Sequence, residues 1–246
     1  MSGAVYLVGA GPGAADLLTL RAARLLAEAD VVLHDALVSA DVLALAPQAK
    51  IYNVGKRGGR PSVDQRFICR LLVRMGLRHR VVVRLKGGDP SLFGRAAEEL
   101  DACRAAGIPV SVVPGVSAGF AAAASLSASL TLRGVARSVT FVTPTVAKRG
   151  VESTAWADAA AVAETAVVYM GATHAERVRD DLIARNVPAS RPIVFIENVS
   201  APNERVIRGA LAELPELAAQ LGDGPALLII GEAIAEARAL AAPVAA

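Results

Sequence analysis

Glycine and proline gather in three short loops that each follow an apolar run. The loops comprise residues 9–13, 87–90 and 114–118. Glycine lets the backbone adopt positive φ and approach a ligand closely, while proline stiffens a turn. Because ligands of open α/β sheets bind beyond the carboxyl ends of the strands, three such loops predict one small-molecule site. Any one of them alone could be an ordinary tight turn.

The residues of the first loop do not decide which ligand binds there. Gly9, Gly11 and Ala14 satisfy the loose pattern G-x-G-x-x-[GA], and Asp35 lies near where a ribose-binding acid would be expected, which together predict an NAD(P)-dependent oxidoreductase. Pro12 counts against this interpretation, because proline has no amide hydrogen to offer a pyrophosphate. A P-loop is excluded, since no segment of the sequence fits GxxxxGK[ST].

Short runs rich in Val and Ile alternate with longer segments of helical period. In the first half the runs are apolar on both faces, which predicts a parallel sheet covered by helices. In the second half several runs follow one another too closely for a crossover helix, which predicts a mixed sheet. The predicted strands are 5–8, 31–34, 51–54, 81–85, 110–113, 139–142, 166–169, 193–196, 206–207 and 227–230. The predicted helices are 19–28, 63–75, 95–106, 117–128, 173–185 and 211–221.

We therefore expect two α/β domains, residues 1–117 and 118–246, with a hinge near residues 115–119.

The amino-acid composition restricts the kinds of partner that we expect. The net charge is only +3, and no run of Lys and Arg is interleaved with aromatic residues, so nucleic acid is not an expected partner. Most of the basic residues are Arg, whose planar fork suits carboxylates and phosphates.

Metal, disulfide and membrane chemistry are not expected. His34, His79 and His174 are scattered and predict no metal cluster, while Cys69 and Cys103 form neither a CxxC pair nor a disulfide framework. The N-terminus lacks the pattern of a signal peptide, and no apolar stretch approaches the length of a membrane span. These features together predict a reducing, cytoplasmic setting.

Five segments follow the first five predicted strands in turn: GAGPG, HDALVS, GKRGGRPS, KGGDPSLFGR and PGVSAG. In this order they resemble the tetrapyrrole methyltransferase family, and the resemblance runs from about residue 5 to residue 231. The GKR loop and the Asp-x-Leu-Val-Ser segment narrow the resemblance to those family members that act on uroporphyrinogen III.

The resemblance implies that S-adenosylmethionine binds in the cleft between the two domains, largely through main chain, and leaves as S-adenosylhomocysteine. A sulfonium is attracted to backbone carbonyls, and an adenine needs apolar walls with a few aimed amides. Met170, without the family, would be interpreted as a packing residue. The positions that match the cofactor contacts of the family are Pro12, Gly87, Gly88, Asp89, Leu92, Ser117, Ala118, Met170 and Val199.

Asp35 matches the proposed general base of the family, and Lys56 matches its proposed proton donor. Methylation of a ring carbon makes a cationic intermediate that must lose a proton, and a carboxylate in an apolar crevice is a reasonable acceptor. Two structural alternatives stay open: Asp35 could cap the next helix, and Lys56 could neutralise substrate carboxylates.

Uroporphyrinogen III is a polycarboxylate, so its pocket needs fixed cations around an apolar floor. Arg57 and Arg60 are the best candidates, with Arg84, Arg95 and Arg133 behind them, because Arg holds a carboxylate bidentately. Arg84 could instead be paired within the fold, and Arg95 could pair with an acidic residue of its own helix.

The resemblance implies two successive methyl transfers, at C2 and C7, giving precorrin-2 for cobalamin- or sirohaem-type cofactors, by a homodimer. The leaving group is neutral, so no metal is expected. The sequence departs from the family at Ala36, Leu132, Pro144 and Val199, which puts the exact substrate in doubt. The rivals are a methyltransferase of the same fold that acts on a later precorrin, the oxidoreductase above, and a non-catalytic tetrapyrrole carrier.

Overall fold

A computed structural model describes residues 3–55, 64–145 and 153–235 of the chain. The chain divides into two compact units, Met1–Ala118 and Gly119–Ala246, and each is described by itself. The division falls at the start of helix α5 (Ala118–Ser125).

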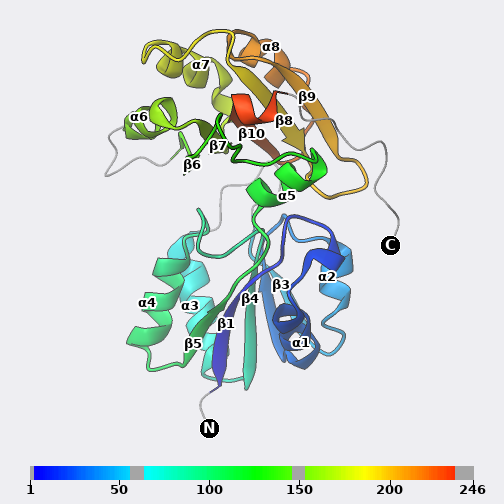
Figure 1. Ribbon diagram of the computed structural model, residues 1–246. Helices are drawn as coiled ribbons and strands as arrows, with labels where there is room; N and C mark the ends of the chain where they lie inside the picture. Colours follow the sequence, from blue (N-terminus) through cyan, green and yellow to red (C-terminus); the bar gives the residue numbers. More distant parts are fainter. Residues whose placement is uncertain (1–2, 56–63, 146–152, 236–246) are drawn as a thin grey trace. The chain divides into compact units, whose positions relative to one another are not determined.

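The first unit is built on a five-stranded sheet in the order β3-β2-β4-β1-β5, in which every pairing is parallel (Figure 1). This confirms the parallel sheet predicted from the apolar runs. The strands are β1 (Ala4–Gly9), β2 (Val31–His34), β3 (Lys50–Asn53), β4 (Val81–Lys86) and β5 (Val110–Val113). Each lies within a residue or two of its predicted range.

Helices cover both faces of this sheet (Figure 1). Successive strand residues point to opposite faces, so β1, β2 and β4 each contribute to two separate apolar clusters. The helices are α1 (Leu20–Glu28), α2 (Ala40–Ala44), α3 (Gln65–Gly76) and α4 (Ala96–Ala105). One cluster joins Val8, Val32 and Leu85 to Leu26 of α1 and Val42 of α2. The other joins Leu7, Leu33 and Val82 to Leu72 of α3 and Cys103 of α4.

The loops after β1 and β4 leave neighbouring strands toward opposite faces of the sheet. The chain leaves β1 for α1, which packs in one cluster, and leaves β4 for α4, which packs in the other. Such a divergence is a topological switch point, the place where open α/β sheets bind their ligands.

Two caps fix where the early helices begin. Thr19 Oγ1 accepts a hydrogen bond from Ala22 N (3.2 Å), so α1 begins after Thr19, and only the short 3-10 turn η1 (Ala15–Leu17) precedes it. Ser39 Oγ accepts from Val42 N (3.4 Å) and caps α2. The alternative that Asp35 caps the next helix is therefore wrong.

The second unit holds a mixed sheet in the order β6-β7-β10-β8-β9 (Figure 1). β6 and β7 are parallel and the other three pairings are antiparallel, which confirms the predicted mixed sheet. The strands are β6 (Val139–Val142), β7 (Thr165–Tyr169), β8 (Pro192–Glu197), β9 (Arg205–Ala210) and β10 (Ala226–Gly231).

Helices α6 (Ala155–Val162), α7 (Ala175–Ile183) and α8 (Leu214–Ala218) share one apolar cluster with this sheet. The predicted helices 173–185 and 211–221 are shorter than expected, because each opens as a 3-10 turn and ends early. These turns are η2 (Ala172–His174) and η3 (Leu211–Glu213), and a further turn, η4 (Glu232–Ile234), follows β10. Within the described ranges, no helix is long and apolar enough to cross a membrane.

Candidate functional site

The first two glycine loops are joined by main-chain hydrogen bonds. Gly88 N donates to Gly11 O (2.7 Å), Gly11 N donates to Gly88 O (3.3 Å), and Ala10 N donates to Lys86 O (2.7 Å). Gly11 and Gly88 have φ of 72° and 65°, a conformation that residues other than glycine adopt at a cost. The loops after β1 and β4 therefore form one continuous backbone surface at the switch point.

The third loop packs directly on the first two. A Cβ atom placed on Gly9 would lie 2.6 Å from Gly115 Cα and 2.6 Å from Gly88 O, closer than real Cβ atoms come to other atoms. A Cβ on Gly88 would meet only Ala118 N at 3.9 Å and Ser117 Cα at 4.0 Å. The three loops thus share one surface, and an atom beside Gly88 would face the start of α5.

Asp89 ties the second loop to the third. Its Oδ2 accepts from Gly115 N (2.9 Å), and its Oδ1 accepts from Ser91 N (2.8 Å) and from Ser91 Oγ. Partial burial acts to raise the pKa of Asp89, but the hydrogen bonds from Ser91 and Gly115 outweigh it, so the pKa lies below its usual value. Asp89 is therefore an ionised link between two loops.

The segment after β2, which carries Asp35, lies beside the first two loops. Ser39 Oγ donates to Gly13 O (3.0 Å), and a Cβ on Gly87 would lie 3.5 Å from Leu37 Cβ. Asp35 N donates to Leu85 O (3.2 Å), which extends the ladder between β2 and β4 by one residue. Asp35 is thus placed at the same edge of the sheet as the glycine loops.

The sequence predicted an apolar crevice around the Asp35 carboxylate. The structure instead places this carboxylate in an ion pair. Its Oδ1 accepts from Arg84 Nη2 (2.5 Å), and the Asp35 side chain is 31% exposed, whereas that of Arg84 is 2% exposed. Arg84 lies on β4 next to β2, so the pairing follows from strand order. This pair confirms the alternative that Arg84 is paired within the fold.

Behind Arg84 lies the fully buried carboxylate of Glu99, on α4. Its oxygens accept from Arg84 Nε (3.0 Å), from Lys86 Nζ (3.1 and 3.0 Å) and from Gln65 Nε2 (3.1 Å). Burial acts to lower the pKa of Arg84, but Asp35 and Glu99 outweigh it and raise that pKa. Burial and the Arg84 charge lower the pKa of Lys86, although Glu99 offsets part of this effect.

The other predicted cations are placed differently. Arg133 is exposed in a turn that Leu132 and Ala136 close by two main-chain hydrogen bonds of 2.8 and 2.7 Å. Arg95, with φ of 55°, pairs bidentately with Glu98 of its own helix (2.8 and 2.8 Å), as the sequence alternative proposed. Three predicted residues lie outside the described part of the chain: Lys56, Arg57 and Arg60.

The two predicted cofactor positions of the second unit lie in turns with unusual backbone. Met170, at the end of β7, has φ of 56° and is 47% exposed, and Thr145 Oγ1 donates to its sulfur (3.7 Å). Val199 is only 5% exposed and lies between two residues with φ of 54° and 62°. Glu204 supports that turn by accepting from Ser200 N (2.6 Å). The main-chain contact expected at Val199 stays a prediction, because the residue as a whole is buried.

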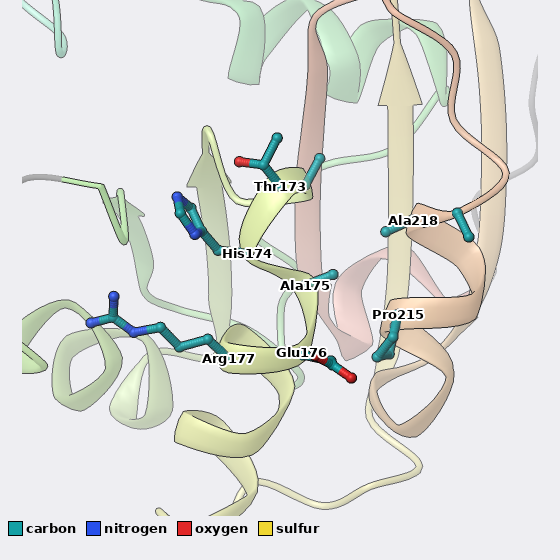
Figure 2. A pocket seen from close by; sticks show the side chains of 9 residues that line it. Thr173, His174, Ala175, Glu176, Arg177, Pro215 and Ala218 are labelled. Carbon is teal, nitrogen blue, oxygen red and sulfur yellow. The ribbon is translucent and has the colours of Figure 1, made fainter.

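An open hollow of about 490 Å³ lies between the start of α7 and α8 (Figure 2). It is lined by Thr173, His174, Glu176, Arg177 and several small residues, so it carries both charge signs. None of the described residues predicted for the site lines it. This hollow is a surface feature of the second unit.

The sequence interpretation missed the ionic group behind Asp35. Its signal lies in β4, where Arg84 and Lys86 are two residues apart in an otherwise apolar strand and so point to the same face. Two buried cations on one face require an acidic partner. The following helix carries Glu98 and Glu99 in its first turn, and the partner in the structure is Glu99.

A parallel sheet with glycine loops joined at its switch point, followed by a mixed sheet, defines a two-domain α/β protein. Residues 4–215 match the family described as Tetrapyrrole (Corrin/Porphyrin) Methylases. The chain belongs to this family, and it is a methyltransferase rather than an oxidoreductase.

Three individual relatives carry more specific names than the family. The chain is 44% identical over 233 residues to uroporphyrinogen-III C-methyltransferase of Pseudomonas aeruginosa, covering 94% of each chain. It is 45% identical over 239 residues to siroheme synthase of Tolumonas auensis, but spans only about half of that protein (51%). Its fold matches uroporphyrin-III C-methyl transferase of Thermus thermophilus complexed with S-adenyl homocysteine, with a TM-score of 0.83, 41% identity and coverage of 95% and 99%.

Proposed function

We propose that this protein transfers methyl groups from S-adenosylmethionine to uroporphyrinogen III, at C2 and then C7, giving precorrin-2. The observation that carries the proposal is the union of three glycine loops at the switch point of the first sheet. Relatives at 44% and 41% identity are named for this substrate, and one of them was crystallised with the demethylated cofactor.

The described loops fit such a cofactor. Glycine at residues 9, 88 and 115 brings bare backbone together, and a Cβ placed on Gly88 would lie in ordinary contact with Ala118 N (3.9 Å), so an added atom fits there without collision. We assign the cofactor to the first-unit positions Pro12, Gly87, Gly88, Asp89, Leu92, Ser117 and Ala118. Met170 and Val199 are the positions that we propose on the second unit.

Bound S-adenosylmethionine supplies an electrophilic methyl group on a sulfonium. The protein aligns the pyrrole carbon with that methyl group, excludes water and removes the proton that the methylated ring must lose. We assign proton removal to Asp35, whose carboxylate is 31% exposed beside the loops, and proton donation to Lys56. Arg57, Arg60 and Arg133 are assigned to the substrate carboxylates.

We further propose that the enzyme is a cytoplasmic homodimer whose product serves sirohaem- or cobalamin-type cofactors. Identity to siroheme synthases supports the former pathway, and the free thiols of Cys69 and Cys103 suit a reducing compartment. Light scattering during gel filtration tests the dimer, which a monomeric mass would contradict.

One experiment tests the proposed function. The protein is incubated anaerobically with uroporphyrinogen III and a labelled methyl donor, and methyl groups in the product are counted by mass. Two added methyl groups are expected. Methylation of precorrin-2 in preference to uroporphyrinogen III would identify a later-precorrin enzyme, and binding without transfer would identify a carrier.

A further inference from the structure

A buried ionic group connects the interior of the first unit to Asp35. Glu99 is fully buried on α4, and the side chains of Arg84 and Lys86 on β4 are 2% and 3% exposed. Arg84 uses Nε for Glu99 and Nη2 for Asp35, so a single guanidinium separates the two carboxylates. A charge change at Glu99 or Lys86 is therefore felt at Asp35 through a rigid, poorly solvated link.

Stability alone does not account for this arrangement. Replacing a buried ion pair by apolar side chains of similar size is often neutral or stabilising, because desolvation offsets much of the attraction. Glu99, Lys86 and Arg84 occupy the face of the sheet that also holds Leu7, Leu33 and Val82, where apolar residues would pack. What distinguishes the ionic version is its contact with a partly exposed carboxylate at the edge of the sheet.

Building on the proposed role of Asp35, we propose that Glu99 and Lys86 are positioning residues that set the proton affinity of Asp35 through the Arg84 guanidinium. Counted together, Arg84 and Lys86 carry two positive charges and Glu99 and Asp35 carry two negative charges. The Glu99 charge offsets Arg84, whereas the Lys86 charge reinforces it.

The experiment compares Glu99→Gln, Lys86→Met and the double variant by the acid limb of kcat against pH. Glu99→Gln leaves an excess positive charge that favours ionised Asp35, so the limb moves to lower pH. Lys86→Met leaves an excess negative charge, so the limb moves to higher pH. Each shift should be about one to two pH units for a charge roughly 7–12 Å away at an effective dielectric of about 20. The double variant, which restores neutrality, should return to within a few tenths of wild type.

The charged and titratable groups beside Asp35 in the described chain are Arg84 and Lys86 on β4, Glu99 on α4, and His34. The His34 ring contacts the Asp35 main-chain oxygen through Nδ1 (2.8 Å). His34→Asn keeps a donor near that position and removes the titration. An acid limb that persists in this variant is not due to His34.

A second readout separates this inference from the proposed function. The Asp35 carboxyl carbon is titrated by NMR in the substrate-free protein for the same variants. Opposite shifts in the two single variants, with cancellation in the double, support the inference whether or not Asp35 acts in turnover. Equal or absent shifts overturn it, even if wild type methylates uroporphyrinogen III. Opposite NMR shifts with an unmoved kcat limb would remove Asp35 from the reaction instead.

Discussion

The two units present their proposed cofactor residues in opposite ways. The first unit uses glycine, and Gly9 and Gly115 approach so closely that a side chain on either would collide with the backbone of the other and with Gly88 O. In the second unit Met170 itself, and Asn198 and Ser200 on either side of Val199, are ordinary residues in a glycine-like conformation, with φ of 56°, 54° and 62°. The first geometry is fixed by the absence of side chains, whereas the second is held by surrounding contacts.

This difference predicts that small side chains in the first unit should do the greatest damage. Gly115→Ala places a Cβ 2.8 Å from Gly9 Cα and closer still to Gly88 O, so the loops must separate. We expect S-adenosylhomocysteine affinity, measured by calorimetry, to fall by at least about 100-fold.

Gly107→Ala is the matched control for backbone strain. Gly107 has φ of 67°, and a Cβ added there would have nothing within 4 Å, so the variant carries strain without collision. It should lose about 1 kcal/mol of stability and keep its affinity for the cofactor. Equal losses of affinity in the two variants would contradict the steric account.

Asp35→Ala should separate chemistry from cofactor binding. Because Asp35 lies beside the loops rather than within them, affinity for S-adenosylmethionine should stay within about threefold, while turnover falls by about 100-fold or more. Single-turnover methylation and calorimetry give the two quantities, and Asp35→Asn controls for shape. Undiminished turnover in both variants would remove Asp35 from the mechanism.

Asp89→Asn should weaken the tie between the second and third loops. Asn can accept through one oxygen only, so either Gly115 N or the Ser91 donors lose their acceptor, and cofactor affinity should fall by about tenfold. The folded-state pKa of Asp89 lies below its unfolded value, so its ionisation stabilises the fold above about pH 4, and this contribution is lost as the pH falls through the folded pKa.

Urea unfolding at several pH values checks the sign. The stability advantage of wild type over Asp89→Asn should be full near neutral pH and shrink in acid. An advantage that grows as the pH falls would show that the carboxyl group is stabilised in its protonated form.

Val199→Ala should have the smallest effect on binding. Val199 is 5% exposed, and the contact that we propose there is through main chain, so cofactor affinity should change by less than about threefold. The lost packing should cost about 1–2 kcal/mol in the free energy of unfolding, measured with urea. A tenfold loss of affinity with unchanged stability would show that the side chain itself contacts the cofactor.

The first sheet was predictable because most of its strands are short apolar runs next to glycine loops, and β2 and β5 match their predicted ranges. Helices α2 and α6 were missed for local reasons. α2 has only five residues, and α6 is an alanine-rich segment, AWADAAAV, without a clear polar face. The 3-10 starts before α7 and α8 depend on packing that propensity does not show.

The candidate site was predictable to the extent that backbone chemistry decides it. Glycine spacing indicated three converging loops, and hydrogen bonds between Gly11 and Gly88 show two of them joined. The ion pairs were harder to predict from the sequence. Arg84 reaches Asp35 and Glu99 only because β2 lies next to β4 and α4 packs on the same face. From the sequence, the pairing of Arg84 within the fold was only an alternative, and neither Asp35 nor Glu99 was identified as its partner.

The central claim is that the three loops of the first unit form one surface that binds the cofactor. It is tested most directly by titrating ¹⁵N-labelled protein with S-adenosylhomocysteine and following the amide signals of Gly11, Gly88 and Ser117. The account predicts that all three shift together on one binding isotherm. Signals that respond in one loop only, or with different midpoints, would contradict it.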